Sequence, residues 1–266
     1  LASLPVELSI TSNAVIIHKF IDILKKYNVN NINLSLDTLI SKKFKEITLR
    51  DEFDIVYKNI FLLVKEGFNV KINAVLMKGV NDNEIVNFIN FTKNLNVSVR
   101  FIEFMPFDGN KWDLSKMVSY KEVMTYVNAS FSNTQIERLQ DAPNDTAKNY
   151  KIKGFKGSFA IISSVTNPFC DSCNRLRLTA NGQLKNCLFS STESDLLTAY
   201  REGKSIEPII QKAVKSKLKV RGGMDTLEKL QNPEKHNQNI QREFLTPHYA
   251  VEMLRQEQSI QAAAAA

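Results

Sequence analysis

The chain has 266 residues, of which 43% are apolar, so it can bury a substantial core in one large domain or two ordinary ones. Its net charge of +7, from 35 Lys and Arg against 28 Asp and Glu, weakly favours a polyanionic ligand. No segment approaches the roughly 18 uninterrupted apolar residues of a membrane helix. The first residues also lack the pattern of a signal peptide, so we expect a cytoplasmic protein without a membrane partner.

The first hundred residues alternate short β-branched segments with longer helical ones. Strands are predicted at residues 7–12, 31–36, 70–76 and 97–104, and helices at 14–27, at 83–95 and from an N-cap at Asp51 through Lys65. This rhythm is typical of βα units around a parallel sheet and predicts an α/β fold. Ligand-binding groups of such sheets collect at strand ends. The candidates in or just beyond these strands are Thr11, Ser35, Lys71 and Met105.

After residue 107 the pattern changes to a helix and several short strand-like segments. The helix is predicted at 119–127, the strands near 134–139, 149–152 and 158–165, a hairpin at Asn181-Gly182 and a helical stretch at 195–217. We therefore expect a separate, smaller and partly β subdomain here. Beyond Gly222-Gly223 the sequence becomes polar and ends in five alanines, which predicts a loosely attached tail.

The chain contains only three cysteines, Cys170, Cys173 and Cys187, in the pattern C-x2-C-x13-C. Thiolates two residues apart can reach one metal centre, and a hairpin can fold the third back onto it. An iron-sulfur cubane with three cysteine ligands keeps one iron free for substrate, whereas structural zinc usually has four protein ligands. We favour the iron-sulfur cluster, with zinc as the second interpretation. A disulfide or plain core cysteines fit the pattern less well.

Arg175 and Arg177 follow the second cysteine and are separated by Leu176. If residues 174–179 form a strand, both guanidinium groups project from one face. Such paired forks suit a phosphate chain or a purine carbonyl. The alternative is a pair of surface arginines on an exposed strand.

The densest basic run lies at residues 212–221, with the sequence KAVKSKLKVR. Runs of this kind are more often a solvated helix face than a nucleic-acid groove. We therefore expect no nucleic-acid partner.

Four segments, FCDSCNRLRLTANGQLKNCLF, VRFIEFMPF, NINLSLD and VKINAVLMKG, carry a resemblance to a known family. Over about residues 8–217 the chain resembles the GTP 3',8-cyclases, the radical S-adenosylmethionine enzymes of molybdenum cofactor biosynthesis. The resemblance implies a partial (βα)6 TIM-like barrel, here without its first strands, followed by a smaller α+β iron-sulfur subdomain. Residues 1–107 would belong to the barrel, 108–222 to the auxiliary cluster and GTP-binding domain, and 223–266 to a poorly matched tail.

The same resemblance implies roles for individual residues. Cys170, Cys173 and Cys187 would ligate a second, carboxy-terminal 4Fe-4S cluster. Ser35 and Met105 would contact S-adenosylmethionine. The contacts to GTP would come from Thr11, Lys71, Arg100, Arg175 and Arg177. The resemblance implies no catalytic residue within this chain.

The implied reaction converts GTP to 3',8-cyclo-7,8-dihydro-GTP through a 5'-deoxyadenosyl radical, which forms at a first 4Fe-4S cluster. The C-x3-C-x2-C motif of that cluster does not occur in this sequence. We therefore expect an amino-terminal truncation that leaves this chain inactive alone. A homodimer is plausible by the same resemblance. The alternatives are a non-catalytic nucleotide- or metal-binding protein and a zinc-stabilised scaffold.

Overall fold

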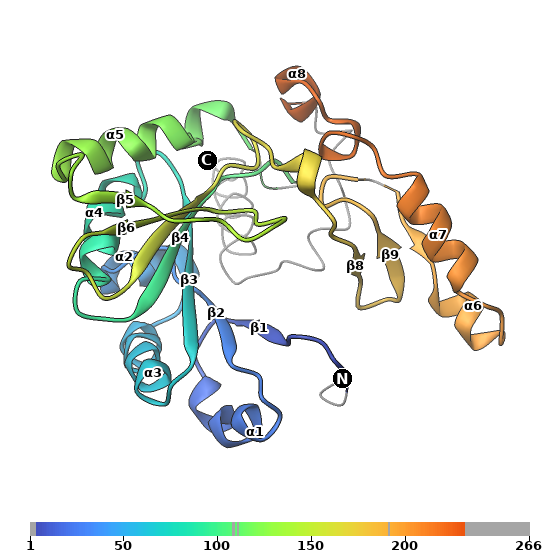
Figure 1. Cartoon of the computed structure of the whole chain (residues 1–266), viewed down its shortest axis with the longest axis horizontal. Coiled ribbons are helices and arrows are strands. Elements are labelled where there is room, and N and C mark those ends of the chain that lie inside the picture. Colours follow the sequence, from blue (N-terminus) through green and yellow to red (C-terminus); the bar gives the residue numbers. More distant parts are fainter. Residues whose placement is uncertain (1–3, 108–109, 111, 191, 232–266) are drawn as a thin grey trace, which may run out of the picture.

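The computed structural model describes residues 4–107, 110, 112–190 and 192–231. Its main feature is a mixed seven-stranded sheet in the order β1-β2-β3-β4-β7-β6-β5 (Figure 1). Strands β1, β2, β3, β4 and β7 run parallel to one another, whereas β6 pairs antiparallel with both β7 and β5. The predicted α/β class is confirmed.

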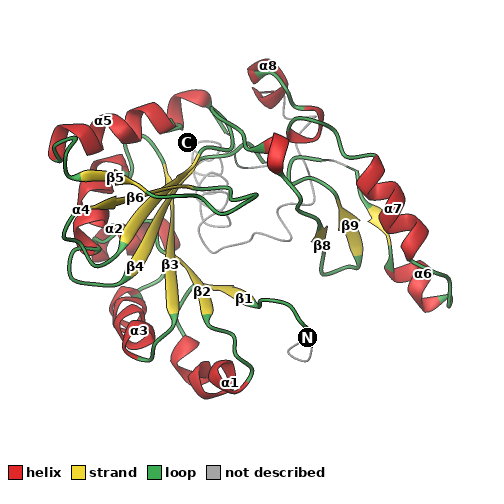
Figure 2. Ribbon diagram, in the orientation of Figure 1, coloured by secondary structure: helices red, strands yellow, loops and turns green. Residues whose placement is uncertain are grey.

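The strands of this sheet are β1 (Ser9–Ser12), β2 (Asn31–Ser35), β3 (Asn69–Leu76), β4 (Val97–Glu103), β5 (Ile136–Arg138), β6 (Lys148–Ile152) and β7 (Ser158–Ile162). The helices on its outer side are α1 (Ile21–Lys26), α2 (Ser41–Thr48), α3 (Phe53–Lys65), α4 (Ile85–Phe91) and α5 (Tyr120–Ser130) (Figure 2). The 3-10 turns η1 (Ile17–Phe20) and η2 (Asp82–Glu84) lead into α1 and α4. All four predicted strands of the first hundred residues are present.

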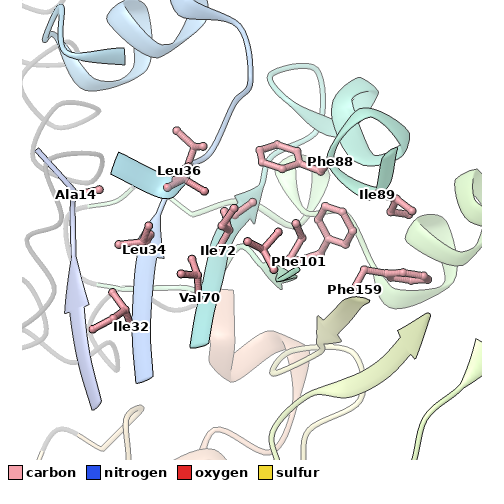
Figure 3. Close-up of a cluster of buried hydrophobic side chains, with 14 of the residues drawn as sticks. Ala14, Ile32, Leu34, Leu36, Val70, Ile72, Phe88, Ile89, Phe101 and Phe159 are labelled. Carbon is pink, nitrogen blue, oxygen red and sulfur yellow. The ribbon is translucent and has the colours of Figure 1, made fainter. Parts of the chain in front are cut away.

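Buried and more exposed residues alternate along the strands, so the two faces of the sheet differ in character. In β3, Val70 and Ile72 are buried with every second residue after them, and the positions between them are half-buried. The buried side chains join the main core with Phe88 of α4 and Phe101 of β4, whose ring centroids lie 6.2 Å apart (Figure 3). Burying each such side chain contributes about 1.5–3 kcal/mol. This packing commits one face to the helices and leaves the other to polar residues.

The start of α3 differs from the prediction. The helix begins at Phe53, and its N-cap position is Glu52, which makes no side-chain capping bond. Asp51, the predicted N-cap, instead forms an ion pair with Lys45 at 2.6 Å. The prediction for Asp51 is wrong because its carboxylate is engaged by the preceding helix, α2. That helix was not predicted at all.

Strands β5 to β7 continue the main sheet instead of starting another one. β7 pairs with β4 from Ser98↔Ser158 to Ile102↔Ile162. A Cβ atom on Gly157, just before β7, would lie 2.2 Å from the carbonyl oxygen of Val97, so only glycine permits this approach. The sheet is therefore continuous across residue 107. The division into 1–107 and 108–222 stays a prediction.

A second, antiparallel sheet consists of β8 (Arg177–Leu178), β9 (Gln183–Lys185) and β10 (Ser194–Asp195). The predicted hairpin at Asn181-Gly182 joins β8 to β9, and Gly182 has the positive φ of 77° that such turns require. The predicted helical stretch contains two helices, α6 (Leu197–Arg201) and α7 (Glu207–Lys215). Within the described ranges, no helix is both long and apolar enough to span a bilayer.

The 3-10 turn η5 (Arg221–Gly223) and helix α8 (Leu227–Gln231) follow α7. Met224 and Leu230 are buried in a small hydrophobic cluster with Met117, Val165 and Phe189. The prediction of a loose tail is therefore wrong for residues 224–231, because Met224 and Leu230 anchor this stretch in a core. Residues 232–266 lie outside the described part.

Candidate functional site

The face of the main sheet opposite the helices carries polar side chains in two neighbouring rows. Strand register defines the first row as Thr11, Asn33, Lys71 and Ser98, and the second as Ser35, Asn73 and Arg100. Four residues predicted for the site, each from a different strand, therefore share one surface. They are Thr11, Ser35, Lys71 and Arg100.

Two asparagines on this surface were missed by the sequence reasoning. Asn33 accepts a hydrogen bond from Arg100 Nη1 and donates one to the carbonyl oxygen of Ile10, both at 3.3 Å. Asn73 has a buried Oδ1 that finds no hydrogen-bond partner among the described residues. Buried amide oxygens normally accept a hydrogen bond, so this atom is available to a ligand. Both could have been predicted, because every second residue of a strand faces the same side. Asn33 lies two residues before Ser35, and Asn73 lies two residues after Lys71.

The polar face holds partly buried positive charge. Burial lowers the pKa of Lys71, and the nearby charge of Arg100 lowers it further, against the opposing effects of Asp145 and Glu7. Burial also lowers the pKa of Arg100, with Asp145 opposing and Arg175 adding to the shift. Cations held together in this way favour an anionic ligand that neutralises them.

The loop between β5 and β6 connects this face to the cysteine region. Arg175 Nη2 donates to the carbonyl oxygen of Asn144 at 3.1 Å, and its guanidinium lies 5.5 Å from the centroid of the Phe169 ring. The side chain of Asn149 donates to both Asp141 and Asp145 at 2.9 Å, which holds the loop in shape. Arg175 Nη1 is buried and has no hydrogen-bond partner in the described part of the chain. This donor is free for a ligand.

The arginine pair is arranged nearly as predicted. The strand is shorter than residues 174–179, because only Arg177 and Leu178 pair with β9. Arg175 and Arg177 are nevertheless half-buried, whereas Leu176 and Leu178 are 40% and 69% exposed. Both guanidinium groups therefore lie on the covered side of this segment.

The three cysteines are free and half-buried. Cys170 opens the 3-10 turn η4 (Cys170–Ser172), and the backbone N–H of Cys173 donates to the carbonyl oxygen of Cys170 at 3.1 Å. Cys187 follows β9, so the β8–β9 hairpin returns it toward that turn. In the described ranges, no group of three or more His, Cys, Asp or Glu residues is arranged to hold a metal ion. A cubane binds its cysteines through different irons, so its thiols need not approach as closely as the ligands of one ion.

The thiols affect one another and differ in their surroundings. Burial raises the pKa of Cys187, and the proximity of Cys170 and Cys173 adds to this, against a backbone N–H bond from Phe189 and the charge of Arg177. Burial also acts to raise the pKa of Cys173. Hydrogen bonds from the backbone of Arg175 and from Lys217 outweigh it, so that this pKa lies below its usual value. Cys187 thus lies within electrostatic reach of both other thiols, which fits a shared sulfur-ligated centre.

Met105 lies apart from the polar rows. It follows the carboxyl end of β4 and packs against the cluster formed by Met117, Val165, Phe189, Met224 and Leu230, which Cys187 also contacts. The structure therefore brings Met105 close to the cysteine region and leaves Ser35 in the sheet rows.

The basic run is only partly a solvated helix face. Lys212, Lys215 and Lys219 are exposed as predicted. Lys217 and Arg221 instead turn inward and contact the turn that carries Cys170 and Cys173. These contacts could not be predicted from local patterns, because they join residues more than 40 positions apart.

Comparison with known proteins finds two family matches. Residues 2–92 match the Radical SAM superfamily, and residues 97–222 match the family described as Molybdenum Cofactor Synthesis C. The mitochondrial GTP 3',8-cyclase of Arabidopsis thaliana is 44% identical over 229 residues, which cover 85% of this chain and 58% of that protein.

Two further relatives come from a nematode and a bacterium. The molybdenum cofactor biosynthesis protein moc-5 of Caenorhabditis elegans is 44% identical over 79% of this chain and 36% of its own length. The GTP 3',8-cyclase of Desulforamulus reducens is 37% identical over 79% of this chain and 66% of its own length. The chain thus spans little more than half of the plant relative and about a third of the nematode one.

Proposed function

Because the chain belongs to the radical SAM family that carries the Molybdenum Cofactor Synthesis C region, we propose that the whole protein is a GTP 3',8-cyclase of molybdenum cofactor biosynthesis. Its substrates are GTP and S-adenosylmethionine. The observation that carries this proposal is the link between a basic sheet face and a cysteine hairpin, made by Arg175 and the β5–β6 loop.

The proposed architecture is a partial (βα)6 barrel made by residues 1–107, with residues 108–222 as the auxiliary cluster and GTP-binding region. Parallel pairing from β1 to β4, with helices on the outer face, supports the barrel. In a barrel of this kind the polar face of the sheet is the inner wall.

GTP lies between the polar rows and the hairpin in this proposal. Lys71 and Arg100 neutralise the phosphates, and the Thr11 hydroxyl donates a hydrogen bond to them, while Arg175 and Arg177 hold the guanine end. The unpaired Nη1 of Arg175 supports this assignment, since a ligand oxygen can satisfy it. Ser35 and Met105 contact S-adenosylmethionine.

Cys170, Cys173 and Cys187 hold a 4Fe-4S cluster with one open iron. A thiol-only donor set on a turn and a hairpin fits this group. When bound, the clusters and S-adenosylmethionine supply the one-electron radical chemistry of the family. The contribution of these residues is positional: they orient the ribose and the guanine toward each other and keep water away.

The test is GTP binding to the full chain after anaerobic cluster reconstitution, with CTP as a control of equal charge. We expect a brown protein that binds GTP more tightly than CTP, since only a purine reaches the hairpin from the shared phosphate site. Cys187→Ser removes the colour and the preference for GTP. A colourless protein with stoichiometric zinc, or equal affinity for both nucleotides, contradicts the proposal.

A further inference from the structure

The segment after α7 closes over the turn that carries two of the cysteines. Lys217 Nζ lies 3.4 Å from Cys173 Sγ and also donates to the carbonyl oxygens of Cys173 at 2.9 Å and Arg175 at 3.0 Å. One ammonium group therefore directs its three donors to the Cys173 thiol, to the carbonyl oxygen of the same residue and to the carbonyl oxygen two residues further on.

Arg221 anchors the other end of this segment. Its backbone N–H donates to Cys170 Sγ at 3.4 Å. Its guanidinium is buried and donates to the carbonyl oxygens of Val165 and Met224 at 2.7 Å and of Asp225 at 2.9 Å. Arg221 also has a positive φ of 42°, which is uncommon for a residue with a side chain.

Gly222 connects the same segment to the third cysteine. Its φ is 62°, and a Cβ atom there would lie 2.9 Å from the backbone nitrogen of Ser190, three residues after Cys187. Residues 217–223, the clasp, therefore contact both cysteine-bearing stretches of the chain.

We propose that the clasp positions the cysteine thiolates and that Lys217 stabilises their negative charge when an iron-sulfur cluster is bound. This inference rests on the cluster assigned under the proposed function. Residues that hydrogen-bond to metal ligands fix ligand orientation. Hydrogen bonds to sulfur and nearby charge also set the reduction potential of a cluster. A cation beside the thiolate favours the more negative, reduced cluster and so raises its potential.

The test compares Lys217→Met with Lys215→Met in the full chain after anaerobic reconstitution. Lys215 is the matched control, because it carries the same charge two positions away and is exposed. The measurements are iron per chain, the rate of iron loss to a chelator, and the midpoint potential from a redox titration followed by electron paramagnetic resonance. We expect Lys217→Met to lose iron roughly tenfold faster or more and to show a lower potential. Lys215→Met should match the unmodified chain.

Lys217→Arg separates charge from packing. It keeps the cation, so we expect its potential to return toward that of the unmodified chain. Circular dichroism checks that each variant is folded. A potential in Lys217→Met equal to that in Lys215→Met overturns the inference and leaves the proposed function intact. An unmodified chain that takes up no iron overturns both.

Discussion

Lys71 lies at the centre of the first polar row, between Asn33 on β2 and Ser98 on β4. Its burial disfavours the charged form, and Arg100 nearby adds repulsion. The negative charge of a bound triphosphate would offset both the cost of burying the Lys71 ammonium and its repulsion from Arg100. The proposed nucleotide would therefore stabilise the charged form of Lys71.

We predict that Lys71→Met weakens GTP binding by roughly tenfold or more, since a hydrogen bond to a charged group contributes about 1.5–3 kcal/mol. Isothermal titration calorimetry measures the effect. Lys58→Met on the exposed side of α3 is the control of equal charge, and we expect it to leave the affinity unchanged. Equal losses in both variants would mean that net charge alone, and not this position, attracts the nucleotide.

Single residues also mark the limit of sequence reasoning. The cysteine spacing and the R-x-R pair could be read directly, because both lie within one short segment. Lys217 could not, since its partner Cys173 is 44 positions away and its neighbours in the sequence are solvated lysines. Long-range contacts of this kind are determined by the packing of α7 against the hairpin, which local patterns do not encode.

Strands were the most predictable elements because one face of each is buried and the other is polar. β3 follows the alternation over all of its eight residues. Helix α2 escaped prediction because only two of its eight residues, Phe44 and Ile47, are buried, within a lysine-rich run. The extension of the main sheet by β5 to β7 was also not predicted. The pairing of β7 with β4 depends on the close approach of Gly157 to Val97, which lies sixty residues earlier in the chain.

Helix α5 begins with a capping box, in which Ser119 and Glu122 each bond the backbone of the other. Hydrogen bonds from Lys78 and Ser119 lower the pKa of Glu122 from 4.5 to about 2. Since the folded-state pKa is depressed, this stabilisation is fully present above pH 4.5 and is lost as the pH falls toward 2.

We predict that Glu122→Gln is less stable than the unmodified chain at neutral pH and that the difference shrinks as the pH falls toward 2. Urea unfolding followed by circular dichroism at several pH values measures it. Glu137→Gln, at an exposed position on β5, is the control. A difference that stays constant with pH would show that the carboxylate charge has no part in the cap.

At the scale of the molecule, Glu103 joins the sheet to the cysteine region. This residue ends β4 and is only 2% exposed. Its carboxylate accepts from the backbone N–H of Tyr120 at 3.1 Å, of Val165 at 2.8 Å and of Thr166 at 2.9 Å, and from the hydroxyl of Thr166. The segment that starts at Val165 leads directly to Cys170, so one side chain fixes its position against the sheet.

We predict that Glu103→Ala lowers the free energy of unfolding by about 3 kcal/mol or more, because three amide donors lose their acceptor at about 1–3 kcal/mol each when buried. Glu103→Gln keeps one acceptor oxygen and should lose less. Urea unfolding measures both, and iron uptake shows whether the cysteine segment has shifted. A loss of under about 1 kcal/mol in Glu103→Ala would mean that water replaces the carboxylate at little cost.

The shared carboxylate has a kinetic consequence. Tyr120 is the first residue of α5 and Val165 precedes the cysteine turn, yet the backbone N–H groups of both donate to the Glu103 carboxylate. Either amide exchanges with deuterium only when its hydrogen bond to the Glu103 side chain breaks, so we expect the two amides to share one free energy of opening. Local opening at the start of helix α5 and in the segment that leads to Cys170 would then be one motion.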